Sequence, residues 1–258
     1  PVERSLWRDS FAPPRRARPP GAVSDPDPTS AEGLAQIQAI TLAAAREAAA
    51  LVLRGFRRRP SPGAEPTYEH KGAVDLVTTY DRDSEALLRE RLSAAFPSFA
   101  IVGEESDDAQ RPASDAVPTF YVDPIDGTTN FVHGHPFWCI SIGLVARERE
   151  VGTSRTPILG VVVAPALGLE LTGFRAPGIA ATTRRSLLDA TGASPPPCVV
   201  SATDRLDEAL LATGFPYDRR TSPDNNFDAF AAIKKKCQGI RRCGSAALDL
   251  CLVADGTY

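Results

Sequence analysis

An eight-residue stretch, Asp123–Asn130, places the tightest constraint on what this chain can fold into. It reads Asp-Pro-Ile-Asp-Gly-Thr-Thr-Asn and follows Thr119–Val122, a short apolar run typical of a buried strand. Proline fixes its own φ and disfavours the helical region for the preceding residue, so Asp123 is expected to be extended. Both aspartates are therefore predicted at the carboxyl end of a strand, where open α/β sheets bind their ligands.

The residue types in this stretch suit a magnesium site. Carboxylates, a backbone carbonyl and water are the ligands that Mg²⁺ takes, and a neighbouring hydroxyl can position a water. The same pattern also occurs in ordinary turns capped by aspartate, because Asp-Gly is a common turn dipeptide. Two further acidic groups favour the metal site: Glu104 and Glu105 follow a strand-like run at 99–102, and Asp81 follows another at 76–80.

Four segments, in this order, resemble the inositol monophosphatase family of Mg²⁺-dependent, lithium-sensitive phosphatases. They are 75–81, 103–106, 123–134 and 244–250, and the resemblance extends over residues 34–258. It implies an α/β (α+β) layered αβαβα sandwich, like that of the inositol monophosphatases and fructose bisphosphatases. The family also has a Gly-x-Gly-Ala-Phe-x-Asn-Gly stretch that residues 174–197 do not match, which leaves the fold of that segment open.

The resemblance implies a role for individual side chains. The implied Mg²⁺ ligands are the carboxylates of Glu104, Asp123 and Asp126 and the backbone carbonyl of Ile125. Thr128, supported by Asp81, is expected to position the attacking water with help from Glu104, and these three form the predicted catalytic set. The predicted substrate-binding residues are Ile125, Asp126, Gly127, Thr128, Gly244, Ser245 and Ala246.

The implied reaction is the Mg²⁺-dependent hydrolysis of a small phosphorylated polyol, inositol monophosphate. Related branches share the Asp-Pro-Ile-Asp-Gly-Thr core, so 3′-phosphoadenosine 5′-phosphate, histidinol phosphate and fructose bisphosphate stay open as alternative substrates. The chain ends at Tyr258, whereas the family continues into another strand and a Trp-Asp motif that completes the second metal site. The domain is therefore expected to lack its C-terminal part and to bind that metal poorly, and an inactive homologue is a third alternative. Relatives are commonly dimers, which predicts a homodimer.

The composition argues against nucleic acid and membranes as binding partners. The chain is 43% hydrophobic and 24% charged, with a formal net charge of −3 that provides no overall attraction to nucleic acid. No apolar run reaches the ~20 residues of a membrane span. Five cysteines without a Cys-x-x-Cys pair favour free thiols in a reducing compartment, so a cytoplasmic location is expected. The basic cluster at 234–242 is interpreted as a solvated helix end, because no aromatic ladder accompanies it.

Local patterns predict the remaining elements. Residues 1–30, rich in Pro and Arg, are expected to form a disordered tail, and residues 31–258 the folded domain. Thr29 and Glu32 fit a capping box that opens the first helix, and Asp81 and Asp83 lie where the N-cap of the second helix is expected. Strands are predicted at 139–146, 158–164 and 169–172, further strands of a second sheet at 199–202 and 210–215, and helices at 225–233 and from 244 onwards.

Overall fold

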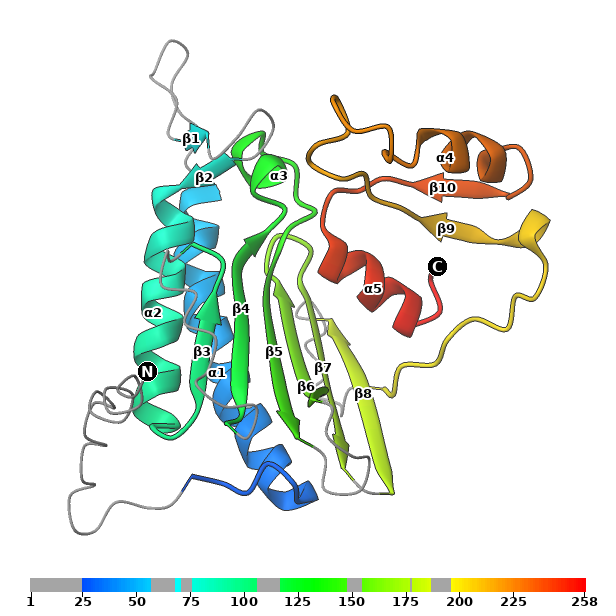
Figure 1. Cartoon of the computed structure of the whole chain (residues 1–258). Coiled ribbons are helices and arrows are strands. Elements are labelled where there is room, and N and C mark those ends of the chain that lie inside the picture. The colour runs from blue at the N-terminus through cyan, green and yellow to red at the C-terminus, as the bar shows by residue number, and fades with distance from the viewer. Residues whose placement is uncertain are drawn as a thin grey trace, which may run out of the picture.

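Helices and sheets alternate in layers through the described part of the chain (Figure 1). The structure, a computed structural model, describes residues 25–56, 68–70, 76–105, 117–147, 155–176, 178–186 and 196–258. A six-stranded sheet carries α1 (Ala31–Phe56) and α2 (Thr79–Ala95) on one face and α5 (Ala246–Ala254) on the other. Beyond α5 lie β9 (Leu210–Ala212), β10 (Gly239–Arg241) and then α4 (Phe227–Lys234). This order confirms the predicted layered sandwich.

The central sheet has the strand order β3-β4-β5-β6-β7-β8. Its strands are β3 (Ala100–Gly103), β4 (Thr119–Asp126), β5 (Cys139–Arg147), β6 (Arg155–Ala164), β7 (Leu169–Ala176) and β8 (Ile179–Ser186). Only β3 and β4 run parallel; the other neighbours are antiparallel. The remaining described elements are the pair β1 (Tyr68–His70) and β2 (Leu76–Thr78), the short helix α3 (Thr128–Val132) and a 3₁₀ turn at Leu206–Glu208.

The main hydrophobic core lies between the two long helices and the sheet. A stripe of alanines at helical spacing lets α1 approach the sheet closely, and Ala44, Ala45, Ala48 and Ala49 are all buried. A smaller cluster on the opposite face holds α5 against the sheet through Leu248. None of the helices in the described ranges is both long and apolar enough to cross a membrane.

Two helix starts differ from the sequence predictions by their capping residue. The amide of Gly33 donates to the hydroxyl of Ser30 at 3.0 Å, so Ser30 caps α1 where Thr29 was predicted. Thr78 caps α2, and Asp81 occupies the third helical position of a complete capping box instead of the N-cap. In both cases a predicted capping residue lies within three positions of the residue whose side chain accepts the hydrogen bond from a helix amide.

Two further expectations about strands need correction. Residues 199–202 form no strand, and Val199 and Val200 are 70% and 63% exposed. In the segment left open by the sequence, 179–186 forms β8, which pairs with β7 along its whole length. A second sheet is present, but β9 covers only the first three of the six residues expected at 210–215, and its partner is β10 at 239–241, within the basic cluster that was interpreted as a helix end. The predicted tail at 1–30 falls largely outside the described residues, which begin at Asp25.

An ion pair between Arg46 of α1, whose side chain is 46% exposed, and the buried Glu170 of β7 is expected to contribute measurably to stability. Arg46 binds the carboxylate of Glu170 through two hydrogen bonds of 2.6 Å, and Glu170 is only 3% exposed. We expect Arg46→Ala to lower the free energy of unfolding by about 3 kcal/mol, because it leaves a buried carboxylate without its partner. Urea denaturation monitored by circular dichroism measures this loss.

The matched control is Arg91→Ala on α2. Arg91 pairs with Glu47 at 2.8 Å, but both side chains are about half exposed, at 44% and 50%. Exposed pairs contribute on the order of 0.5 kcal/mol. Equal losses in the two variants would contradict the assignment of Glu170 as a carboxylate that depends on Arg46.

Candidate functional site

Parallel pairing of β3 with β4 brings the first two acidic groups together. The register joins Gly103 to Val122, the last pair of this parallel ladder, so the next residues, Glu104 after β3 and Asp123 within β4, lie side by side where the pairing ends. This is the carboxyl end of both strands, where α/β sheets place their ligands. The sequence prediction that two strand ends deliver carboxylates to one place therefore matches the topology.

A β-bulge brings Asp126 to the same face as Asp123. In a regular strand two residues three positions apart point to opposite faces of the sheet. Here Asp123 pairs with Ser141 and Asp126 pairs with Cys139, so three steps along β4 match two steps along β5. The extra residue restores a common orientation, because cross-strand partners share a face and positions 139 and 141 lie on one face of β5. The bulge between Asp123 and Asp126 therefore allows both side chains to lie on the same face of the sheet.

The carboxyl groups at this edge act on one another electrostatically. The pKa of Asp123 is raised to about 9, first by burial, then by the negative charges of Glu104 and Asp126, and further by a hydrogen bond with Glu104. Like charges that cannot all be hydrated disfavour ionisation. A divalent cation bound between the carboxylates would relieve this repulsion. Without a cation, protonation of Asp123 relieves it.

Thr128 and Asp81 meet as the sequence analysis expected. Gly127, in the left-handed region at φ 101°, turns the chain from β4 into α3 and so places Thr128 next to α2. The hydroxyl oxygen of Thr128 lies 3.0 Å from Oδ1 of Asp81 and 3.0 Å from the carbonyl oxygen of Ile125. Because a hydroxyl has one proton, it donates to one of these acceptors at a time and keeps a lone pair available.

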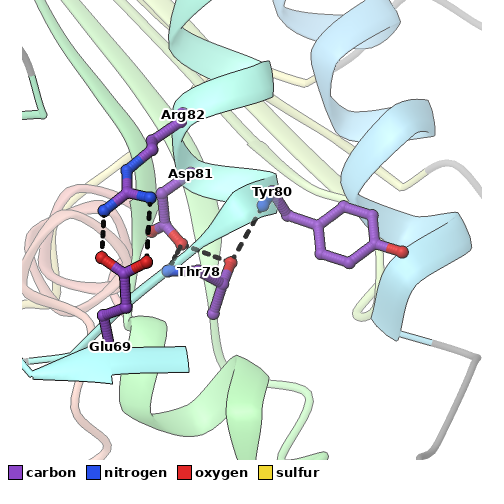
Figure 2. Close-up of polar contacts among 5 residues, drawn as sticks. All are labelled: Glu69, Thr78, Tyr80, Asp81 and Arg82. Atoms are coloured by element: carbon purple, nitrogen blue, oxygen red, sulfur yellow. Dashed lines mark hydrogen bonds and ion pairs between the residues drawn. The ribbon is translucent and has the colours of Figure 1, made fainter. Parts of the chain in front are cut away.

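Asp81 is fixed from its other side by the start of α2. Its Oδ2 accepts hydrogen bonds from the amide and the hydroxyl of Thr78, at 2.8 and 2.6 Å, and the Thr78 hydroxyl also accepts from the amide of Tyr80 (Figure 2). Next to this network Arg82 pairs with Glu69 of β1 at the surface. Burial raises the pKa of Asp81 although the hydrogen bonds from Thr78 and Thr128 oppose the shift. The helix cap and the candidate catalytic pair are thus one hydrogen-bond network.

The carboxylate of Asp126 is held by the start of α5. Its Oδ2 accepts from the hydroxyl of Ser245 and from the amide of Ala247, each at 2.7 Å, and Oδ1 accepts from the amide of Ala246 at 3.3 Å. Helix amides near an N-terminus attract a carboxylate. Gly244, at φ 91°, makes the turn that aims these donors at the β4 edge. The predicted residues Gly244, Ser245 and Ala246 thus join the acidic edge through Asp126.

Two residues at this site were missed by the sequence analysis. Glu85 of α2 is 3% exposed and accepts a hydrogen bond from the amide of Glu105 at 2.7 Å, which fixes the loop after β3. Asn130 donates from Nδ2 to the carbonyls of Phe137 and Cys243, both at 2.7 Å. It thereby ties α3 to the turn before α5. Glu85 lies four residues after Asp81 on one helix face, a spacing that could have revealed it.

The donor set fits Mg²⁺ in its chemistry. Carboxylate oxygens and a backbone carbonyl are hard ligands of the kind that this ion prefers. Over the described residues, however, no three His, Cys, Asp or Glu side chains are already gathered as in a formed metal site. Asp126 is one reason that the carboxylates are not gathered, because both of its oxygens accept hydrogen bonds from the start of α5. The acidic groups are close enough to perturb the pKa of Asp123, but they do not form a closed cage.

A cavity of about 480 Å³ opens beside Asp126, between α5 and the β9–β10 unit. Its walls combine charged, aromatic and small residues: Asp126, Phe215, Tyr217, Arg242, Gly244, Ser245, Ala246 and Asp249 are among them. A cavity of this size holds a small molecule. The cavity adjoins the acidic edge, because Asp126 belongs to both.

Sequence comparison agrees with this arrangement. The profile of the inositol monophosphatase family matches residues 34–258. The chain belongs to the inositol monophosphatase family. Inositol-1-monophosphatase of Synechocystis sp. is 42% identical over 190 residues, which are 73% of this chain and 58% of that protein. Inositol monophosphatase of Mesembryanthemum crystallinum is 34% identical over 226 residues, covering 86% of this chain and 74% of the relative.

A solved structure supports the same family fold. The structure of inositol monophosphatase from Anabaena (Nostoc) sp. PCC 7120 superposes with a TM-score of 0.68 at 33% sequence identity. The match covers 87% of this chain and 73% of that one. This chain therefore spans between about three fifths and three quarters of the inositol monophosphatases described here.

Proposed function

We propose that this protein is a phosphoric monoester hydrolase that releases inositol and phosphate from inositol monophosphate. The observation that carries the proposal is the shared acidic edge of β3 and β4, where Glu104 and Asp126 raise the pKa of Asp123. It lies within the region that matches the family profile, and the relatives described above are named inositol monophosphatases. Hydrolysis of another small phosphomonoester is a less favoured alternative, because the names of these relatives specify inositol monophosphate as the substrate.

The metal ligands of this proposal are Glu104, Asp123, the carbonyl of Ile125 and Asp126. When bound there, Mg²⁺ would neutralise phosphate charge and lower the pKa of a water. Thr128 would accept a proton from the attacking water at Oγ1 while its own proton passes to Oδ1 of Asp81, 3.0 Å away. The burial that raises the pKa of Asp81 makes it a better proton acceptor than an exposed aspartate.

The substrate side of the site is assigned to the start of α3 and the start of α5. Gly127 and Thr128 would contact the phosphate, directly after Asp126 in the chain. The polyol would occupy the cavity lined by Gly244, Ser245 and Ala246. With its acidic wall and its small, polar helix start, this cavity suits a hydroxylated ligand.

Phosphate release from inositol 1-phosphate tests the proposed function. We expect turnover by the full-length protein with MgCl₂, none with EDTA, and inhibition by lithium, the family property implied by the resemblance. Adenosine 3′,5′-bisphosphate, histidinol phosphate and fructose 1,6-bisphosphate serve as competing substrates. The proposal fails if the protein, folded and saturated with Mg²⁺, hydrolyses one of these in preference to inositol 1-phosphate, or none of the four.

We further propose a reducing, cytoplasmic location and a homodimer. The location is supported by the five cysteines, which all carry free thiols. Sedimentation equilibrium of the purified protein tests the dimer, and a monomer at micromolar concentration would remove it. Retention of all five thiols in protein isolated from cells tests the location.

A further inference from the structure

One face of α5 forms a wall of the cavity beside Asp126. Ala246, Asp249, Leu250 and Val253 all line this cavity. They follow the spacing i, i+3, i+4 and i+7, which places side chains on a single side of a helix. Asp249 is the acidic member of this set, and it lies one helical turn after the amide of Ala246 that binds Asp126.

The carboxylate of Asp249 has an unused hydrogen-bonding capacity. Its Oδ1 is buried and has no hydrogen-bond partner among the described residues. A buried acceptor without a partner costs stability, about 1–3 kcal/mol in typical cases. Most buried polar groups have a partner, so the few exceptions in native structures call for a reason such as a ligand.

The charges around Asp249 indicate which ligand groups it would accept. Burial and the charge of Asp126 raise its pKa to about 6, and Arg242 opposes the shift. Two carboxylates on one side of the cavity repel a phosphate group. They attract hydroxyl groups, which donate hydrogen bonds to carboxylate oxygens.

We propose that Asp249, which lines the cavity shared with Asp126, is a specificity-determining residue that accepts hydrogen bonds from the hydroxyl groups of the polyol. The inference rests on the proposed phosphatase function, and it deepens it by assigning the polyol side of the substrate to α5.

The test compares a polyol substrate with one that has no hydroxyl groups. In Asp249→Ala we expect the KM for inositol 1-phosphate to rise about tenfold, as for a lost hydrogen bond to a charged group, while kcat stays within about twofold. The KM for 4-nitrophenyl phosphate is expected to stay unchanged. Alanine is a strong helix former, so α5 is expected to persist in the variant.

Asp255→Asn provides the matched control on the same helix. Asp255 is the C-cap of α5 and does not line the cavity. We expect its KM for both substrates to equal that of the wild type. A rise in KM of equal size for both substrates in Asp249→Ala would mean that the residue acts on the site as a whole, and would overturn the proposal.

Equilibrium binding of free inositol separates this inference from the proposed function. Titration calorimetry needs no turnover, so it decides the role of Asp249 even if the wild type releases no phosphate. We expect inositol to bind the wild type and Asp255→Asn equally and Asp249→Ala about tenfold more weakly, again as for one lost charged hydrogen bond. Absence of inositol binding to the wild type, or equal affinity in all three proteins, would overturn the proposal.

Discussion

Replacing Asp123 by asparagine is expected to abolish phosphate release while making the metal-free protein more stable. Asparagine removes the negative charge at the centre of the acidic edge, so activity with Mg²⁺ is expected to fall by at least about 10³-fold, typical for the loss of a central charge-stabilising group. Phosphate release from inositol 1-phosphate measures the first effect. Thermal and urea unfolding in EDTA measure the second.

The sign of the stability effect follows from the pKa of Asp123. Its folded value of about 9 lies above the ordinary value of 3.8, so folding takes up a proton between these two pH values. Stability contributed by the protonated carboxyl is complete below pH 3.8 and is lost as the pH rises towards 9. Asparagine does not titrate, and we therefore expect the advantage of Asp123→Asn to be absent at pH 3.5 and to reach at least about 2 kcal/mol at pH 8, since each unit of pKa shift corresponds to about 1.4 kcal/mol.

Asp83→Asn is the matched control for this variant. Asp83 is exposed on α2, two residues after Asp81, and its substitution is expected to change the free energy of unfolding by less than about 0.5 kcal/mol. An Asp123→Asn protein that is less stable than the wild type at pH 8 in EDTA would show that the acidic groups do not repel one another. Retention of full activity would exclude Asp123 from the site.

Thr128→Val is expected to reduce kcat by about 10²- to 10³-fold, the range for a lost proton-transfer group. Valine keeps the shape of threonine but removes the hydroxyl that lies between Asp81 and the carbonyl of Ile125. The cost in stability is expected to be only about 1–2 kcal/mol, because Oδ1 of Asp81 loses one hydrogen bond while Oδ2 keeps its two from Thr78. Steady-state kinetics and urea denaturation separate the two effects.

Two neighbouring variants make this prediction specific. Thr128→Ser keeps the hydroxyl, so we expect it to retain activity within about tenfold of the wild type. Thr129→Val changes the exposed next residue of α3 and is expected to leave kcat unchanged. If Thr128→Val kept the activity of Thr129→Val, the hydroxyl would have no part in the reaction.

Local sequence was sufficient to predict the acidic edge and much of the fold. Apolar runs that end in carboxylates identified β3 and β4, and their parallel pairing then places Glu104 beside Asp123. The layered architecture followed from the family resemblance, and the structure has it. The contact of Thr128 with Asp81 was likewise predicted from the resemblance, and it is present at 3.0 Å.

Features that depend on distant partners could not be read from local patterns. Val199 and Val200 have strong strand propensity, but no neighbouring strand pairs with them, and both are exposed. Strand β8 carries few large apolar residues and forms because β7 offers it an edge. The hydrogen bonds from α5 to Asp126 span 119 to 121 positions in the sequence, beyond the reach of any spacing rule.

This long-range clamp has a consequence for protein synthesis. The ribosome delivers the acidic strand ends long before Ser245 and Ala247, the donors that hold Asp126 at 2.7 Å. A growing polypeptide therefore exposes mutually repelling carboxylates until α5 emerges and docks. The donors that hold Asp126 lie 119 and 121 positions further along the chain, so a nascent chain that has not yet reached α5 lacks this support for its acidic edge.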